Sequence, residues 1–243
     1  MPQNHFVWTD LSTFDMNHAR TDYAKLFGWR FWDDPAYDFA TLGEEPVAAV
    51  FPMPAALAKI NMPSFWMSYV AVVDVDVVVE KARAHDGAII EVEPQAFGDD
   101  AIVALIRDPM GAGFTVYQGP EIGQSASGVG RVMERYYHAP DINAVASFYK
   151  DLFGWTFQPM GTDPWPTFVI ADHYGAPVAV AEQIPDEIRG KFRYWMPCFG
   201  VADTSRATQT LQTQGGAVHW EIGDGRHLAA DAQGAHFLFM ATT

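Results

Sequence analysis

The nine residues "YAKLFGWRF" (23–31) return almost unchanged as "YKDLFGWTF" (149–157). The second copy begins 126 residues after the first (149 minus 23), which is slightly more than half of the 243-residue chain. A phrase repeated at that distance indicates that a whole domain is duplicated.

Each copy of the phrase is typical of a helix that ends at a glycine. Asp15 is placed to cap the helix, and apolar residues then recur at helical spacing as far as Phe27. Gly28 predicts the end of the helix because glycine readily adopts the left-handed conformation, and the alternation after it is typical of a strand. Asp141 and Gly154 predict the same start and the same stop in the second copy.

A weaker repeat, at an offset of 129 residues, links the segment that begins at Tyr69 to the one that begins at Cys198. The helix caps and stops expected in these two segments are Asp74, Gly87, Asp203 and Gly216. Both segments close on a turn and a strand, at "RDPMGAGFTVYQ" (107–118) and "ADAQGAHFLFM" (230–240). The chain is therefore expected to hold four modules of one strand, one helix and about three strands, near residues 4–55, 64–118, 130–184 and 192–241.

The segment "QGPEIGQSASGVG" (118–130) is rich in Gly, Ser and Pro and is typical of an exposed linker. We expect a first domain at residues 1–118, a linker at 119–129 and a second domain at 130–243. A module whose strands are apolar on one face cannot bury that face alone, so two modules should pair in each domain. The expected α+β fold is a curled mixed sheet with helices outside and a concave inner face, here called the cup, where a ligand would bind.

Charge and composition limit the partners and the compartment. Lys and Arg number 15 against 30 Asp and Glu, so the formal net charge of -15 argues against nucleic acid and permits a neutral or cationic small molecule. The single cysteine, Cys198, cannot form an internal disulfide, which favours the cytoplasm. The sequence has no apolar run that predicts a membrane span, and it leaves open a homodimer.

The repeated Asp-helix-LFGW phrase and the "V-x-D … D-P-x-G" phrase of Val72 to Gly111 resemble the vicinal oxygen chelate superfamily. That group contains glyoxalase I, bleomycin-resistance proteins, fosfomycin-resistance proteins and extradiol dioxygenases. The resemblance covers nearly the whole chain, as two domains in tandem. It implies that an enzyme of this kind would hold a divalent metal in its cup, through a His or Gln near the start of a module's first strand and a Glu in a last strand.

The positions that this resemblance identifies in the first half hold Trp8, Tyr69 and Thr115. None of the three is a plausible ligand for such a metal, so the first domain is expected to be metal-free. The resemblance to bleomycin-resistance proteins then implies a cup that binds a small organic molecule, and Trp8 could form an aromatic floor for a flat or cationic ligand.

The second half offers a less uniform set. Its matching positions hold Glu134, Cys198 and Leu238, and His236 lies on the same strand face as Leu238. Glu134, Cys198 and His236 could bind a metal together with Glu182, or they could be an ion-paired residue, a small core residue and a hydrogen-bonded strand residue.

The predicted function is therefore the binding of an aromatic or cationic small molecule, with no cofactor, no assigned metal ligand and no assigned catalytic residue. The predicted ligand-binding residues are Trp8, Tyr69, Thr115, Glu134, Cys198 and His236. The alternative is a lyase, isomerase or dioxygenase that uses one divalent metal in the second domain.

Two further groups of residues are candidates for the site. His219, Glu221, Arg226 and His227 form a polar cluster that favours either acid-base chemistry or a solvated strand and turn. Trp66 and Trp195 precede the second strand segment of each half, where they could line the rim of a cup.

Overall fold

The computed structural model describes residues 3–59, 62–123, 127–189 and 193–242. Over these ranges, no helix has the length and apolar character needed to cross a membrane.

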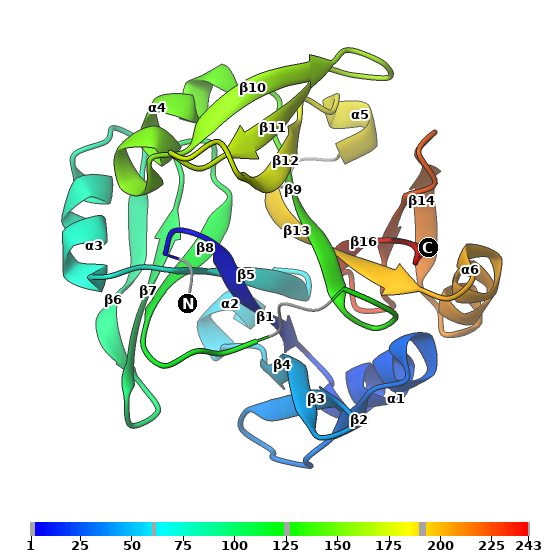
Figure 1. The fold of residues 1–243 in the computed structure, drawn as a ribbon. Helices are drawn as coiled ribbons and strands as arrows, with labels where there is room; N and C mark the ends of the chain where they lie inside the picture. The colour runs from blue at the N-terminus through cyan, green and yellow to red at the C-terminus, as the bar shows by residue number, and fades with distance from the viewer. Residues whose placement is uncertain (1–2, 60–61, 124–126, 190–192, 243) are drawn as a thin grey trace. The chain divides into compact units, whose positions relative to one another are not determined.

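Each half of the sequence forms its own mixed sheet of eight strands (Figure 1). The first sheet has the order β2-β3-β4-β1-β5-β8-β7-β6 and is made of β1 (Phe6–Thr13), β2 (Arg30–Phe31), β3 (Asp38–Leu42), β4 (Glu45–Pro52), β5 (Phe65–Ala71), β6 (Ile89–Phe97), β7 (Ala101–Arg107) and β8 (Gly113–Gln118). The second sheet has the order β10-β11-β12-β9-β13-β16-β15-β14 and is made of β9 (Val132–His138), β10 (Thr156–Gly161), β11 (Thr167–Ala171), β12 (Pro177–Glu182), β13 (Tyr194–Val201), β14 (Ala217–Glu221), β15 (His227–Ala230) and β16 (His236–Ala241). The expected α+β fold of four repeated modules is confirmed.

One helix follows the first strand of every module, and a short helix joins the modules within each half. The helices are α1 (Met16–Phe27), α2 (Ala55–Lys59), α3 (Val75–Arg83), α4 (Asn143–Phe153), α5 (Asp186–Arg189) and α6 (Thr204–Thr213). The repeated glycine ends α1 and α4 as predicted, because Gly28 has φ 76° and Gly154 has φ 74°. The carboxylates of Asp15, Asp74 and Asp203 accept the backbone N–H three residues further on, so these three caps are confirmed.

Three of the expected helix boundaries were wrong. The N-cap of α4 is Ile142, although the Asp141 carboxylate still accepts the backbone N–H of Asn143 at 2.9 Å. Helix α3 ends before Gly87, with Ala84 as its C-cap in a right-handed conformation. After α6 the glycine in the left-handed conformation is Gly215, with φ 88°, and not Gly216. The helix ends one residue earlier than the match between the two weaker repeat segments predicted.

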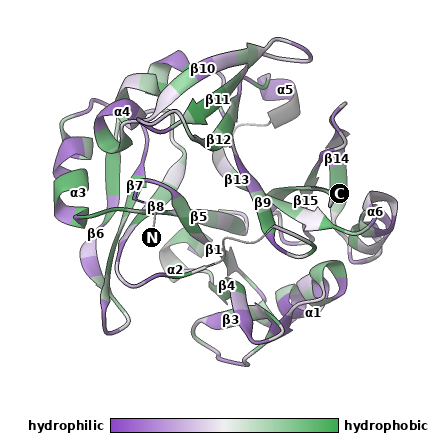
Figure 2. Ribbon diagram, in the orientation of Figure 1, coloured by the Kyte–Doolittle hydropathy of each residue, from purple (hydrophilic) through white to green (hydrophobic). Residues whose placement is uncertain are grey.

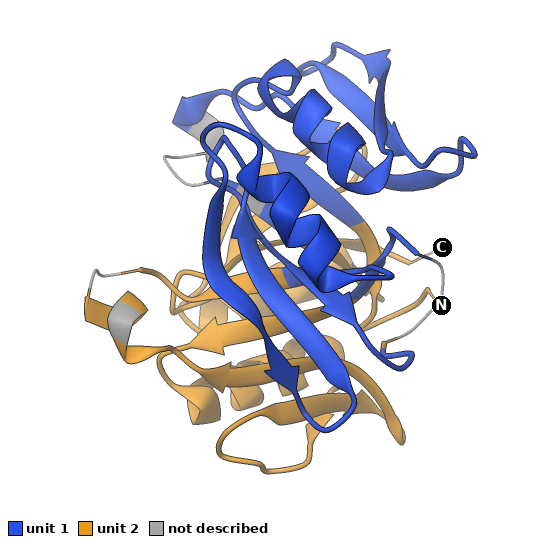
Figure 3. Cartoon of the chain, turned by 90° about the vertical axis from the view of Figure 1, so that its left-hand side faces the viewer, with its two compact units in different colours: residues 1–7, 68–122, 135–195 blue, residues 8–67, 123–134, 196–243 orange. Residues whose placement is uncertain are grey.

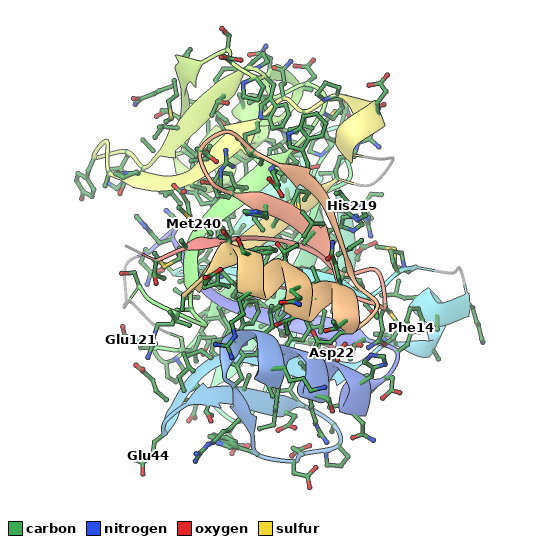
Figure 4. The ribbon with its side chains drawn as sticks, turned by 90° about the vertical axis from the view of Figure 1, so that its right-hand side faces the viewer. Phe14, Asp22, Glu44, Glu121, His219 and Met240 are labelled. Carbon is green, nitrogen blue, oxygen red and sulfur yellow. The ribbon has the colours of Figure 1, made fainter. Side chains whose placement is uncertain are left out.

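The chain divides into two compact units, and each unit draws on both halves of the sequence (Figure 3). Unit 1 contains Met1–Val7, Ser68–Ile122 and Arg135–Trp195, and unit 2 contains Trp8–Met67, Gly123–Glu134 and Met196–Thr243. Helix α3 packs with α4 in unit 1, and α1 packs with α6 in unit 2 (Figure 4). Within each unit, a module from one half of the sequence thus packs its helix against the helix of a module from the other half. The domain boundaries expected from the linker stay a prediction.

A buried hydrogen-bond network lies in the core of unit 1, around Asp108 of the "D-P-x-G" turn. Its Oδ2 atom accepts the hydroxyls of Tyr137 at 2.7 Å and of Tyr149 at 2.8 Å. Its Oδ1 atom accepts the backbone N–H groups of residues 110 and 112. The indole of Trp195 donates to the Tyr149 hydroxyl at 2.7 Å, and burial raises the pKa of Asp108.

The core of unit 2 contains the same kind of hydrogen-bond network, but it lacks the second tyrosine hydroxyl. Asp231 accepts the Tyr23 hydroxyl at 2.9 Å, and the Trp66 indole donates to Tyr23 at 3.2 Å. The place of Tyr137 is taken by Leu11, 126 residues earlier, which has no hydroxyl to donate. The tyrosine of the repeated phrase therefore docks on the turn of a module in the other half of the chain.

Trp66 and Trp195 belong to these cores, so the expectation that they line a rim was wrong. They are 5% and 2% exposed, and both indoles donate to the core tyrosines. Figure 2 shows hydrophobic and hydrophilic residues mixed along α3 and α4, as expected for helices that cover a core with one side only.

Candidate functional site

The two faces of strand β1 are set by the packing of Leu11. Leu11 is fully buried in the core of unit 2 with Tyr23 and Phe27 of α1. Because successive side chains of a strand point to opposite faces, Trp8, Asp10 and Ser12 lie on the face away from α1.

The register of the neighbouring strands extends this face across three strands. Asp10 pairs with Ala49 of β4, and Ala49 pairs in turn with Phe39 of β3. Ser12 pairs with Phe51 one step along the same face. The alanine side chain is small, so the larger side chains of β1 and β3 project further from the sheet on either side of it.

A buried carboxylate, a phenol and an indole are linked in series on this face. The indole N–H of Trp8 donates to the Tyr37 hydroxyl at 2.9 Å, and that hydroxyl donates to Asp10 Oδ2 at 2.9 Å. Trp8 is 3% exposed and Asp10 1% exposed, whereas Tyr37 is partly exposed. Trp8 and Asp10 therefore fix the position of a ring that reaches the surface.

Further aromatic rings surround Tyr37. Phe39 lies 5.3 Å from the Tyr37 ring and 5.9 Å from Trp8, and Phe51 is stacked on Tyr37 at 6.0 Å. Trp32 lies 4.7 Å from Phe39. We call these five rings the aromatic face; its members are Trp8, Trp32, Tyr37, Phe39 and Phe51, all in unit 2.

The matching positions in the second half carry different chemistry. The counterparts of Trp8 and Asp10, 126 residues further on, are Glu134 and Tyr136. The place of the pair Ser12–Phe51 is taken by His138 and Glu182, which are register partners on β9 and β12. The two halves share the fold, but Glu134 and Glu182 stand where the first half has Trp8 and Phe51, and Tyr136 stands where it has Asp10.

His138 and Glu182 form a buried pair in unit 1. His138 Nε2 lies 2.9 Å from Glu182 Oε2, and their side chains are 0% and 1% exposed. The sequence singled out Glu182 but missed His138, whose signal was its position on the same alternating face as Glu134 in the strand "VMERYYH".

The other predicted residues fall into two groups. In unit 1, Tyr69 and Thr115 are register partners on β5 and β8, and both are almost fully buried. Their predicted role in ligand binding stays a prediction. In unit 2, Cys198 and Leu238 are register partners on β13 and β16, and Cys198 is fully buried.

Glu134 and His236, both in unit 2, are partly buried. His236 Nδ1 lies 3.1 Å from the carbonyl oxygen of Gly234, and its ring stacks on His219 of β14 at 5.3 Å. Over the residues that the structure describes, no three His, Cys, Asp or Glu side chains are grouped so as to hold a metal ion. The donor set Glu134, Cys198 and His236 therefore does not fit a metal centre of the superfamily type.

The polar cluster of β14 and β15 is solvated only in part, because His219 and Glu221 are exposed whereas Arg226 is buried. His227 Nε2 lies 3.9 Å from Glu221 Oε1, and the Glu221 side chain is 75% exposed. Arg226 pairs with Asp224 at 2.6 Å. His219 lies at the outer strand β14 (Figure 4).

Comparisons with known proteins give relatives along the whole chain, although no model of a protein family matches it. The chain is 31% identical over 245 residues to CFP32 of Mycobacterium bovis, a protein named as a glyoxylase, over 95% of this chain and 92% of that protein. It is 28% identical over 242 residues to the anthracycline biosynthesis protein DnrV of Streptomyces peucetius, over 90% of this chain and 84% of that protein. The solved Mn(II)-bound glyoxalase from Novosphingobium aromaticivorans has a TM-score of 0.65 at 12% identity, over 98% of this chain and 82% of that chain.

Paired modules of this kind in eight-stranded mixed sheets define the glyoxalase and extradiol dioxygenase class of fold. The chain belongs to the vicinal oxygen chelate superfamily, in its tandem two-domain form.

Proposed function

We propose that the protein binds a flat aromatic molecule on the aromatic face of its first half, without using a metal there. The observation that carries the proposal is the series Trp8–Tyr37–Asp10, which holds a partly exposed phenol in one orientation on the side of β1 away from the core. Rings held in fixed orientations stack on a flat ligand without a large loss of side-chain entropy.

The name of a relative suggests the class of ligand. DnrV, which is similar over 90% of this chain, is named for anthracycline biosynthesis, and anthracyclines contain a flat tetracyclic ring system. An aromatic surface suits such a molecule better than a carboxylate and imidazole surface does, which favours the first half over the second as the binding face.

The proposal predicts that replacing Tyr37→Phe weakens the binding of daunomycinone, a neutral tetracyclic aglycone, by about tenfold, because the hydroxyl that joins Trp8 to Asp10 is lost. Binding is measured by titration, following the fluorescence of the tetracycle. Phe51→Leu, which removes the ring stacked on Tyr37 and keeps an apolar side chain, is expected to weaken binding as well.

Tyr174→Phe is the matched control, since Tyr174 is 85% exposed and lies in unit 1. It should bind the aglycone as the wild type does. Wild-type affinity in both Tyr37→Phe and Phe51→Leu, or no saturable binding by the wild type, would overturn the proposal.

A second candidate function is catalysis from the second half, and the buried pair His138–Glu182 favours it. An imidazole beside a carboxylate can hold and transfer a proton, and the same two residue types are metal donors in other proteins. Among the described residues no third donor of this kind is grouped with the pair, so this candidate rests on the proton chemistry of His138 and Glu182.

Metal analysis of protein purified without chelator separates the two candidates. The binding proposal predicts clearly substoichiometric Fe, Mn, Ni and Zn. A stoichiometric metal that disappears in the variant carrying His138→Ala and Glu182→Ala, but persists in His219→Ala, would instead support an enzyme. His219 is a suitable control because it is an exposed histidine of an outer strand.

A further inference from the structure

We propose that Trp32, together with Asp33 and Asp34, forms the outer wall of the ligand site and selects a flat aromatic molecule that carries a positive charge. This inference rests on the proposed function, since it assigns a ligand charge and further residues to the same face. Trp32 was not among the residues that the sequence indicated as ligand contacts.

Trp32 extends the aromatic face out to solvent. Its ring packs at 4.7 Å against Phe39, which in turn contacts both Trp8 and Tyr37. Trp32 is nevertheless 60% exposed, the highest value among the rings of this face. A large ring that is exposed and is also continuous with a buried aromatic cluster has an open side on which a second flat molecule can stack.

The segment that carries this ring is held in place by Arg20 of α1. The Arg20 guanidinium donates to Asp33 Oδ1 at 2.9 Å and to the carbonyl oxygen of Asp34 at 2.8 Å, and its Nε lies 2.6 Å from Asp38 Oδ2. The Arg20 side chain is 17% exposed and Asp38 is fully buried, so the contact with Asp38 is shielded from water, whereas the Asp33 side chain is 89% exposed. Three contacts to one arginine fix the backbone on both sides of the loop.

The inner turn of the loop is fixed in the same way. The Asp34 carboxylate accepts the backbone N–H groups of Ala36 and Tyr37 at 2.7 and 3.2 Å. The turn therefore positions both Tyr37 and Trp32, two members of the aromatic face, through one hydrogen-bonded segment. A site whose rings are already in place loses less conformational entropy when a ligand binds.

The charge of the loop favours a cation. Residues 32–38 contain three aspartates, and Arg20 pairs with two of them, Asp33 and Asp38, so the segment and Arg20 together carry a formal charge of -2 (one minus three). Both Asp33 and Asp34 are exposed. Backbone hydrogen bonds from Ala36 and Tyr37 lower the pKa of Asp34, so this carboxylate is ionised at neutral pH. An ammonium group near these carboxylates would also be attracted to the face of the Trp32 ring.

The test compares daunorubicin, which carries an amino sugar, with its neutral aglycone daunomycinone, in titrations of the full chain. Trp32→Ala is expected to weaken daunorubicin binding by about tenfold, and Trp32→Phe to restore most of it, because a smaller ring still stacks. Trp220→Ala, which removes a 42% exposed indole of β14 in the same unit, is the matched control and should bind as the wild type does.

The charge is tested by the double variant Asp33→Asn and Asp34→Asn. Asparagine keeps the side-chain oxygens that Arg20 and the turn use, and it tolerates the left-handed backbone of Asp33, which has φ 70°. This variant should lose several-fold in affinity for daunorubicin and leave daunomycinone unchanged.

The outcomes separate the two proposals. Unchanged binding of both probes in Trp32→Ala, with binding by the wild type intact, would overturn the role of Trp32 and leave the proposed function standing. Equal losses for the two probes in the asparagine variant would overturn the selection for a cation. A wild type that binds neither probe would overturn both proposals together.

Discussion

Replacing Asp108→Ala is expected to lower the free energy of unfolding by about 4 kcal/mol, because the change leaves four donors without their acceptor. Two of them are the hydroxyls of Tyr137 and Tyr149, which are fully buried. The other two are the backbone N–H groups of Met110 and Ala112. Denaturant unfolding followed by tryptophan fluorescence measures the loss.

Two other aspartates form a graded control series for this prediction. Asp231 occupies the same kind of turn but accepts one tyrosine hydroxyl, so Asp231→Ala should cost about 1 kcal/mol less than Asp108→Ala. Asp172 also closes a turn through two backbone N–H groups, but its other carboxylate oxygen faces His5 instead of a tyrosine. Equal losses for all three variants would show that the turn, and not the buried hydroxyls, is responsible.

The stability difference between the wild type and Asp108→Ala is also expected to depend on pH. Burial raises the pKa of Asp108 in the folded protein above its value in the unfolded chain. The folded state then binds a proton more readily, so this group favours folding increasingly as the pH falls through the raised pKa toward the ordinary aspartate value of about 4. The difference in stability between wild type and Asp108→Ala should therefore grow on acidification, and a difference that shrinks would contradict the shift.

Gly130→Ala is expected to destabilise the fold by about 3 kcal/mol, through a steric clash as well as backbone strain. Gly130 has φ 73°, and a Cβ atom there would lie 2.6 Å from the carbonyl oxygen of Phe27. Its own carbonyl accepts the Trp29 indole N–H at 2.7 Å, so the segment cannot move away without losing that hydrogen bond. Thermal and denaturant unfolding measure the effect.

Gly28→Ala separates the clash from the strain. Gly28 has nearly the same backbone angle, φ 76°, and a Cβ atom there meets nothing within 4 Å. Its substitution should cost about 1 kcal/mol, the usual penalty for a left-handed alanine. If the two variants lose the same stability, the close approach of Gly130 to Phe27 does not matter.

Most of the fold could be predicted because its helix caps and helix stops depend on nearby residues in the sequence and occur in both halves. A capping aspartate such as Asp15 and a stop such as Gly28 act within one helix, so their neighbours in the sequence are sufficient to identify them. The partner of Tyr23 could not be found in this way. Its hydroxyl donates to Asp231, 208 residues away, and local spacing carries no information about such a contact.

Alternation along a strand tells which residues share a face, but not which residue of another strand lies opposite. Tyr69 and Thr115 were located by separate counts, Thr115 from the "D-P-x-G" turn, and their pairing across β5 and β8 comes from the structure alone. The same alternation, applied from Tyr69, puts Trp66 three residues away on the opposite face, in the core, where it was not expected. Tyr37 and Trp32 escaped notice because the loop from 32 to 37 has no period, and its shape depends on Arg20 of another element.

The exchange of modules between the halves has a consequence for the origin of the chain. Each core is assembled from both copies of the repeat, as the contact between Tyr149 and Asp108 illustrates. An ancestor of single length would have held only one side of every such contact, and a second molecule of itself would have had to supply the other. Duplication therefore turned an encounter between two chains, which depends on concentration, into an intramolecular step that does not.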